Sequence, residues 1–291
     1  MLDIIVNPKA GKNGKKILKA LPKIEKRLIE RNVSYVIHKT EMPNHATALT
    51  KSLIDGGATC IVVVGGDGTL HEVINGFDNF DKVTLGIIPC GTGNDFASNL
   101  KLPLDVVEAL DLILDGEPKY TDFMQMPTVR GLNIIGMGID VDVLKRYRAL
   151  KRKNKFGYTA CLIKTLFKFD YIDFSCNFDQ NESAEDYRSF IACIANGHCY
   201  GGGIPICPIA DSTDKKLDFI AVKEIKRSKI IGAFLKLKGG KILSLKETTH
   251  KNMQTIQITP NGHYTVNVDG ELYDDIPFEV KIVSDKLRVF R

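Results

Sequence analysis

A glycine-rich loop with an acidic residue at its centre follows a wholly apolar run. Gly65-Gly66-Asp67-Gly68-Thr69 comes directly after Cys60–Val64 and precedes residues with helical spacing. Glycine lets a backbone approach a phosphate closely, and the free amides at a helix start favour its negative charge. A simple turn does not need a charged residue such as Asp67, so its presence also indicates a functional site. The loop matches neither the dinucleotide fingerprint nor a Walker A loop, so a plain tight connection is the alternative.

Two further polar loops follow predicted strands in the same part of the chain. Asn7-Pro8-Lys9-Ala10-Gly11 follows the first strand, and Gly91-Thr92-Gly93-Asn94-Asp95 follows the fourth. In open α/β sheets, ligands bind beyond the carboxyl ends of parallel strands. We therefore expect all three loops to converge on one ligand-binding crevice.

The elements that must position these loops alternate between strand and helix. Apolar runs and helical spacing predict strands near 4–6, 33–38, 60–64 and 83–88, and helices near 17–28, 46–53, 70–77 and 106–113. This alternation predicts an α/β fold with a doubly wound, mostly parallel sheet over residues 1–122.

Residues 123–291 contain many short strands, interrupted by helix only between about 141 and 169. They predict a β-sandwich-like second domain, with the last strand free to return to the first domain.

The composition excludes several classes of protein. The chain has 291 residues, of which 44% are hydrophobic, so it is long enough for two domains and too apolar to be disordered. No run approaches the roughly 20 apolar residues that span a bilayer. The first residues predict a strand, so we expect no signal peptide. Seven cysteines without paired spacing indicate reduced thiols in a cytoplasmic protein. The net charge of +5 permits an anionic partner without specifying one, and nothing indicates nucleic-acid binding.

Six motifs occur in a fixed order. The three loops above are followed by Asn196-Gly197, Tyr200-Gly201-Gly202-Gly203 and Asp269-Gly270-Glu271. Together they resemble the bacterial diacylglycerol kinase family of lipid kinases, relatives of sphingosine and ceramide kinases, over nearly the whole chain. The resemblance implies a nucleotide domain, a β-sandwich, and phosphorylation of a lipid hydroxyl by ATP with Mg²⁺. The ATP contacts that it implies are Asn7, Pro8, Lys9, Ala10, Gly11, Thr40, Gly66, Asp67, Gly68, Thr69, Leu70, His71, Glu72 and Thr92.

Two positions depart from the family pattern. His71 stands where the family usually has Asn, which puts the role of that position in doubt. The family's Asp-Gly-x-Leu-Asp segment reads Asp214-Lys215-Lys216-Leu217-Asp218 here. The resemblance implies Mg²⁺ binding by Asp211, Asp214 and the carbonyl of Lys216, and oxygen ligands suit this ion. We expect Lys215 to need only a different backbone angle, and an acidic surface turn is the alternative.

Phosphoryl transfer needs alignment, charge neutralisation and a base for the attacking hydroxyl. By resemblance, Glu271 is the proton acceptor and Asp269 belongs to an acidic network with Asp67. A hairpin turn is the alternative interpretation of Asp269-Gly270-Glu271.

His198 with Cys193, Cys199 and Cys207 matches no zinc spacing, so we expect ordinary buried thiols. His250 shows no pattern.

Two basic segments carry apolar residues beside their charges. Lys145–Lys155 precedes an apolar stretch to Phe169, and Lys223–Lys246 contains Ile230-Ile231 and Phe234-Leu235. Basic clusters beside amphipathic stretches hold proteins to anionic lipid, although a solvated helix face is equally compatible. We predict peripheral association with the inner face of the membrane.

The sequence thus predicts an ATP- and Mg²⁺-dependent lipid kinase, with diacylglycerol as the favoured substrate and phosphatidic acid as the product. Its partners would be nucleotide and lipid at the membrane surface, with a homodimer left open. One alternative is an NAD kinase, which shares the Gly-Gly-Asp-Gly turn and a β-rich second domain. The other is a catalytically silent lipid- or nucleotide-binding protein.

Overall fold

The computed structural model describes residues 1–291 except 12, 151–154, 167, 182 and 227–228. The chain divides into two compact units. Unit 1 comprises Met1–Asp122 with Ser284–Arg291, and unit 2 comprises Phe123–Val283. The last eight residues of the chain thus belong to the first unit.

Unit 1 is built on a parallel sheet. Its strands are β1 (Leu2–Val6), β2 (Tyr35–Lys39), β3 (Cys60–Gly65) and β4 (Thr84–Pro89), in the order β4-β3-β1-β2. The end of β15 (Glu279–Phe290) adds a further parallel neighbour, since Arg288 pairs with Thr84 of β4. The central strand β3 is buried from Ile61 to Gly65, which explains its unbroken apolar sequence.

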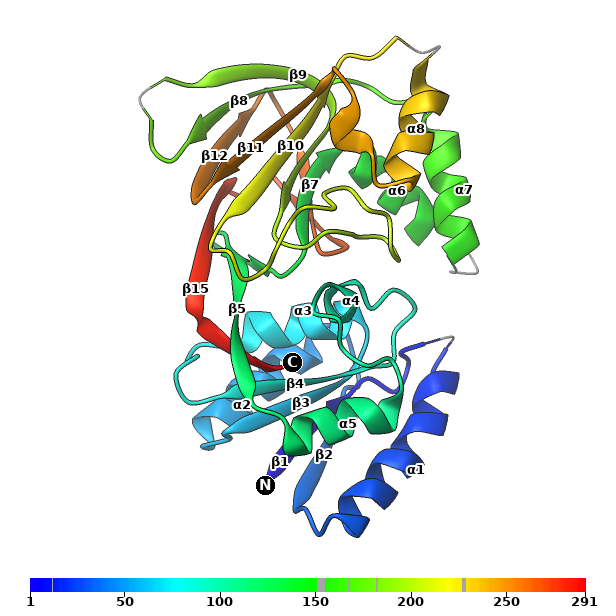
Figure 1. Ribbon diagram of the computed structural model, residues 1–291, viewed down its shortest axis with the longest axis vertical. Coiled ribbons are helices and arrows are strands. Elements are labelled where there is room, and N and C mark those ends of the chain that lie inside the picture. Colours follow the sequence, from blue (N-terminus) through cyan, green and yellow to red (C-terminus); the bar gives the residue numbers. More distant parts are fainter. Residues whose placement is uncertain (12, 151–154, 167, 182, 227–228) are drawn as a thin grey trace. The chain divides into compact units, whose positions relative to one another are not determined.

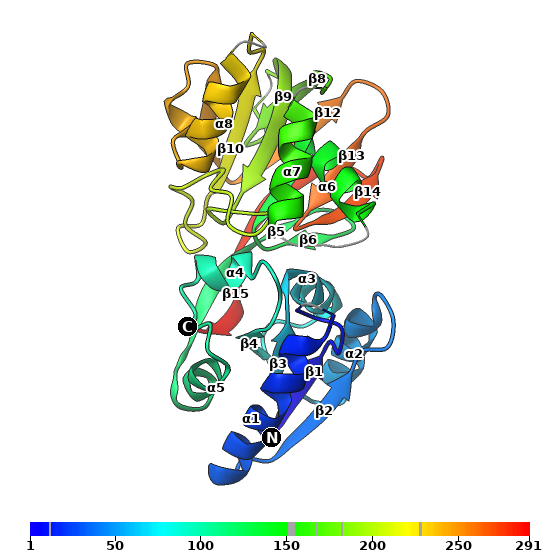
Figure 2. The same ribbon diagram turned by 90° about the vertical axis from the view of Figure 1, so that its right-hand side faces the viewer.

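Helices cover both faces of this sheet. Apolar residues of α1 (Lys15–Glu30) and α5 (Val106–Asp115) pack against side chains of β1, β3 and β4 in one core. On the other side of the sheet, α2 (His45–Asp55) and α3 (Asp67–Gly76) lie against each other (Figure 2). The short helix α4 (Asp95–Asn99) follows the third glycine loop. The predicted doubly wound architecture is confirmed.

Unit 2 is an antiparallel, β-sandwich-like assembly with helices on one side (Figure 1). Its pairing order is β14-β13-β7-β9-β8-β12-β15, and β10 pairs with both β9 and β11. The strands are β6 (Arg130–Gly131), β7 (Ile134–Gly138), β8 (Ile172–Phe178), β9 (Glu185–Ala195), β10 (Leu217–Lys223), β11 (Thr248–Met253), β12 (Thr255–Pro260), β13 (Thr265–Val268) and β14 (Glu271–Asp274), and β5 (Pro118–Gln125) leads in from unit 1.

The helices of unit 2 cover one apolar core. They are α6 (Ile139–Arg148), α7 (Lys155–Leu166), α8 (Ile230–Lys238) and the short 3₁₀ helix η2 (Ile242–Ser244). The helices α6 and α7 occupy the predicted helical region. In contrast, α8 was expected only as a basic segment, because its lysines interrupt the apolar run. Within the described part of the chain, no helix is long and apolar enough to cross a membrane.

Candidate functional site

The three predicted phosphate loops of unit 1 contact one another. Asn7 Nδ2 donates a hydrogen bond to Thr69 Oγ1 at 3.0 Å, which joins the first loop to the second. Lys16 Nζ donates to the carbonyl of Gly91 at 2.6 Å, which joins α1 to the third loop. A Cβ atom on Gly66 would lie 2.8 Å from Gly91 Cα, so this approach requires glycine. The loops therefore converge as predicted, and Lys16 is a linking residue that sequence reasoning missed.

Asp67 links the second and third loops through backbone amides. Its carboxylate accepts hydrogen bonds from Asn94 N at 2.7 Å and from Phe96 N at 3.3 Å, at the start of α4. The sequence argument that a structural turn has no use for this charge was therefore wrong. The carboxylate positions the third loop, and any contact with a ligand comes in addition to this role.

The second loop forms the first turn of α3. The helix begins at Asp67, three residues earlier than predicted, with Gly66 as its N-cap. Amides in a first helical turn have no partner within the helix, and the helix dipole favours an anion beside them. Gly68 is exposed there, as are Lys9 and Thr92 on the other loops. Exposed amides and one lysine ammonium are groups that suit a polyphosphate.

Other predicted ATP contacts serve the packing of unit 1. Leu70 and His71 are buried on α3. Glu72 Oε2 accepts a hydrogen bond from Ala46 N at 3.0 Å and so ties α3 to α2. Thr40, which follows β2, donates its amide to the carbonyl of Val6 at 2.9 Å. A direct contact of these side chains with ATP stays a prediction.

The acidic turn of unit 2 connects β13 and β14. Asp269 has a left-handed backbone, with φ 51°, and its Oδ1 accepts the amides of Asn133 at 2.9 Å and Ile134 at 3.0 Å. This carboxylate therefore holds the start of β7. Glu271 is paired through Oε2 with Arg148 Nη2 at 2.5 Å, and the Glu271 side chain is 45% exposed. The proposed base thus has access to solvent and a cation at its side.

A buried polar pair supports the same turn. Asn267 Nδ2 donates to Asp140 Oδ2 at 3.1 Å, and Asn267 Oδ1 accepts the amide of Gly270 at 2.8 Å. Burial raises the pKa of Asp140 to about 6, although the bond from Asn267 opposes the shift. Arg148 Nη2 also donates to the Gly270 carbonyl at 2.7 Å. Sequence reasoning missed both residues of the pair, because neither belongs to a local motif.

The predicted magnesium turn precedes β10. Asp214 Oδ1 accepts Lys216 N at 3.0 Å, and Asp211 Oδ1 accepts Thr213 N at 3.0 Å. Burial raises the pKa of Asp214, and the charges of Asp218 and Asp211 raise it further. Lys215 adopts φ 63°, the left-handed region that glycine enters without strain. The two carboxylates lie in one short turn, and carboxylate oxygens are ligands that suit a hard divalent cation.

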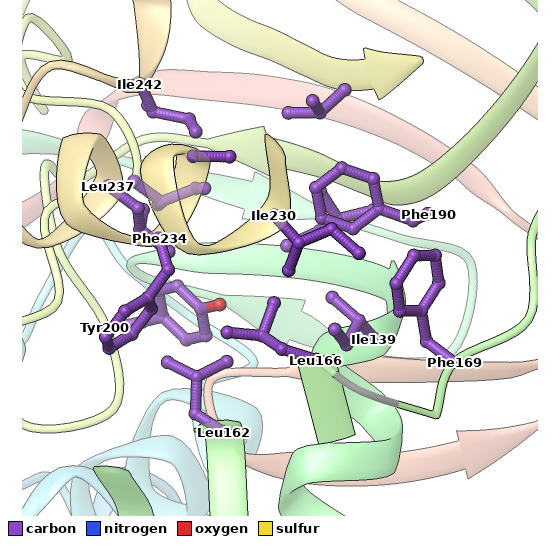
Figure 3. Close-up of a pocket in the computed structure, with 14 residues that line it drawn as sticks. Ile139, Leu162, Leu166, Phe169, Phe190, Tyr200, Ile230, Phe234, Leu237 and Ile242 are labelled. Carbon is purple, nitrogen blue, oxygen red and sulfur yellow. The ribbon is translucent and has the colours of Figure 1, made fainter. Parts of the chain in front are cut away.

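An apolar cavity lies between the helices and the sheet of unit 2 (Figure 3). Its free volume is only about 30 Å³, so the lining side chains nearly fill it. Side chains from α7, α8 and β9 point into it together. Its lining comprises Ile139, Leu162, Leu166, Phe169, Phe190, Ile191, Tyr200, Ile206, Val222, Ile230, Ala233, Phe234, Leu237 and Ile242.

The two predicted basic segments have different outcomes. Residues 151–154 of the first lie outside the described residues, as do the side chains of Lys155 and Phe156. In the second, α8 buries Ile230 and Ala233 while Ile231 and Leu235 are 58% and 62% exposed. The helix therefore carries an outward apolar pair beside lysines, which is the amphipathic arrangement that the sequence suggested.

Comparisons with known proteins agree with this organisation. Residues 2–126 match the family model of the diacylglycerol kinase catalytic domain, and residues 133–291 match the YegS C-terminal NAD kinase beta sandwich-like domain. A diacylglycerol kinase of Mycobacterium tuberculosis is 26% identical over 99% of this chain and 94% of its own. One from Staphylococcus saprophyticus gives the same three values. A crystal structure of a diacylglycerol kinase from Bacillus anthracis has a TM-score of 0.74 and 24% identity, covering 99% of this chain and 96% of that one, which shows the shared fold.

Proposed function

The chain belongs to the bacterial diacylglycerol kinase family of lipid kinases, and from this premise we propose that it transfers the γ-phosphoryl group of ATP to a lipid hydroxyl, that of diacylglycerol first, to give phosphatidic acid. The observation that carries the proposal is the junction of three polar loops in unit 1, through Asn7–Thr69, Asp67–Asn94 and Gly66–Gly91. A junction of this kind gathers amides and a lysine around one anion.

The chain's own residues would bind, align and deprotonate. ATP with Mg²⁺ supplies the phosphoryl group and neutralises its charge. The amides at the start of α3 would hold the phosphates. The hydrogen bonds of Asn7 and Asp67 would hold the three loops together. Asp211, Asp214 and the Lys216 carbonyl would hold a structural Mg²⁺. These assignments rest on the resemblance and on the fit of the donor groups described above.

Glu271 would accept the proton of the attacking lipid hydroxyl. Its carboxylate is half exposed, and the pairing with Arg148 orients it. The Asn267–Gly270 bond, together with the hydrogen bonds that Asp269 accepts from the amides of Leu132, Asn133 and Ile134, fixes the turn that carries Glu271. Arg148 would have to yield part of this pairing when the hydroxyl arrives.

The cavity of unit 2 supports a lipid acceptor over NAD. Apart from the Tyr200 hydroxyl, its lining side chains are hydrocarbon, so an acyl chain that pushed them apart would meet apolar groups, whereas a nicotinamide dinucleotide would find few partners. The outward Ile231 and Leu235 of α8 would enter the membrane interface beside Lys236 and Lys238. We therefore propose a peripheral association with anionic membrane and leave the lipid alcohol to experiment.

ATP consumption with different acceptors tests the proposal. Diacylglycerol in mixed micelles should support turnover with Mg²⁺, and NAD should not. A bulky residue at Ala233 in the cavity should raise KM for long-chain diacylglycerol more than for a short-chain analogue. Turnover with NAD alone would favour the NAD kinase alternative, and ATP binding without turnover on any acceptor would favour a silent binding protein.

A further inference from the structure

Three side chains from separate segments of unit 2 converge away from the acidic turn. Cys207 lies between β9 and β10, Asp218 is in β10 and His250 is in β11. Their sulfur, carboxylate oxygen and ring nitrogen all lie within 4.8 Å of one another. The antiparallel pairing of β10 with β11 sets Asp218 opposite Asn252, and diagonally next to His250 on the same face. The grouping is therefore a product of the fold.

Two of the three side chains are buried, and the third is partly exposed to solvent. Cys207 is 0% and Asp218 3% exposed, whereas the His250 side chain is 25% exposed. Asp218 Oδ1 accepts Asn252 Nδ2 at 2.7 Å and meets His250 Nε2 at 2.6 Å. A buried carboxylate is costly unless it is paired, and a hydrogen-bonded histidine is a metal ligand with its ring already oriented.

The protonation state of the Cys207 thiol distinguishes a catalytic nucleophile from a metal ligand. Burial, with the charge of Asp218, raises the pKa of Cys207 to about 12, while backbone hydrogen bonds from Ile209 and Ala210 oppose this shift. A thiol with such a pKa is not a nucleophile, so a Cys-His-Asp catalytic arrangement is disfavoured. A bound divalent cation would favour the thiolate over the thiol. The S–H proton would leave to solvent, and a thiolate–metal bond would form.

We propose that Cys207, Asp218 and His250 bind a zinc-type divalent transition-metal ion. Sulfur, nitrogen and oxygen donors together suit Zn²⁺ or Co²⁺, and thiolate is a poor ligand for Mg²⁺. Three protein ligands leave the fourth tetrahedral position for water. The ion would fasten the β9–β10 loop to the paired strands β10 and β11. This site is separate from the oxygen-only turn of Asp211, Asp214 and Lys216, and it does not depend on the proposed kinase reaction.

Cobalt titration tests the site with a spectroscopic readout. Metal-stripped full-length protein is titrated with Co²⁺ in excess Mg²⁺, which fills oxygen-only sites. We expect a near-ultraviolet thiolate-to-cobalt charge-transfer band that saturates at one Co²⁺ per chain and is lost on adding Zn²⁺. Cys207→Ser should abolish the band, and His250→Ala should weaken Co²⁺ binding at least about tenfold. Two controls, Cys176→Ser at a buried thiol of β8 and His263→Ala at an exposed ring, should change neither result.

Several outcomes would overturn the site. These are a wild-type protein without the band, a band that persists in Cys207→Ser, and Co²⁺ binding that excess Mg²⁺ abolishes. If Cys207→Ser does not fold, His250→Ala carries the test, because its side chain is partly exposed. Unchanged Co²⁺ affinity in that variant, with a wild-type circular dichroism spectrum, contradicts the proposal.

Discussion

At the residue scale, the proposed chemical step depends on Glu271 as the base that accepts the proton of the lipid hydroxyl. A lipid hydroxyl is a poor nucleophile until it loses its proton, and general-base assistance typically contributes about 10²–10⁴-fold in rate. Glu271→Gln keeps the shape and the contact with Arg148 but accepts a proton poorly. We expect kcat to fall about 10²-fold or more while the Kd for ATP stays unchanged. Glu279→Gln, at an exposed residue, serves as a control. Near-normal turnover of Glu271→Gln would contradict the assignment and make Asp67 the leading candidate for the base.

Gly68 tests the phosphate loop at the same scale. It is exposed in the first turn of α3, so a methyl group fits the fold but stands where a phosphate would approach the backbone. Gly68→Ala should weaken ATP binding at least about tenfold without lowering the melting temperature. Gly232→Ala in α8 is the matched control, because its added Cβ meets nothing within 4 Å. Wild-type ATP affinity in folded Gly68→Ala would remove the phosphate-loop assignment.

Asp140 gives a pH dependence of stability with a defined sign. Its pKa rises from 3.8 to about 6 on folding, so the folded state holds the proton more tightly than the unfolded chain does. This contribution to the free energy of unfolding is full below about pH 4 and is lost as the pH rises through about 6, with a total near 3 kcal/mol. Denaturant unfolding of wild type and Asp140→Asn at several pH values measures it. The difference between the two proteins should change over this window, and a constant difference would contradict the buried-acid account.

At the element scale, α8 is proposed to meet the membrane through Ile231 and Leu235. Replacing both by Gln should lower binding to anionic vesicles and activity on them, because it removes apolar area from the interface. ATP binding should not change. Leu18→Gln, at an exposed apolar residue of α1, controls for the loss of surface hydrophobicity. Equal vesicle binding by the double variant and by wild type would exclude α8 as the docking element.

The sequence predicted the elements whose patterns are local. The continuous apolar run of β3 and the glycine loops after β1, β3 and β4 were enough to place the parallel sheet and the convergence of its loops. Helix α8 was missed because lysines interrupt its apolar spacing, and packing on the sheet decides its fold. Asp67 and the Cys207–Asp218–His250 group show the limit more sharply. Their partners come from distant segments, which no spacing rule reaches.

At the scale of the whole molecule, the proposed peripheral association predicts reversible docking on the surface of an anionic membrane. The net charge of +5 is small, so the docking force would come from local lysines and arginines. Activity on vesicles should therefore rise with the fraction of anionic lipid and fall as salt screens these charges over about 10 Å. A titration of phosphatidylglycerol content at low and high ionic strength measures this effect. Equal activity on neutral and anionic vesicles at both salt concentrations would reject electrostatic docking.

The most direct test of the central claim is identification of the phosphorylated product. Full-length protein is incubated with γ-labelled ATP, Mg²⁺ and diacylglycerol in mixed micelles, beside parallel reactions with phosphatidylglycerol, undecaprenol and NAD. The account predicts labelled phosphatidic acid in the first reaction, a yield lowered about 10²-fold by Glu271→Gln, and no labelled NADP. Label in NADP, or in none of the lipid alcohols, would contradict it.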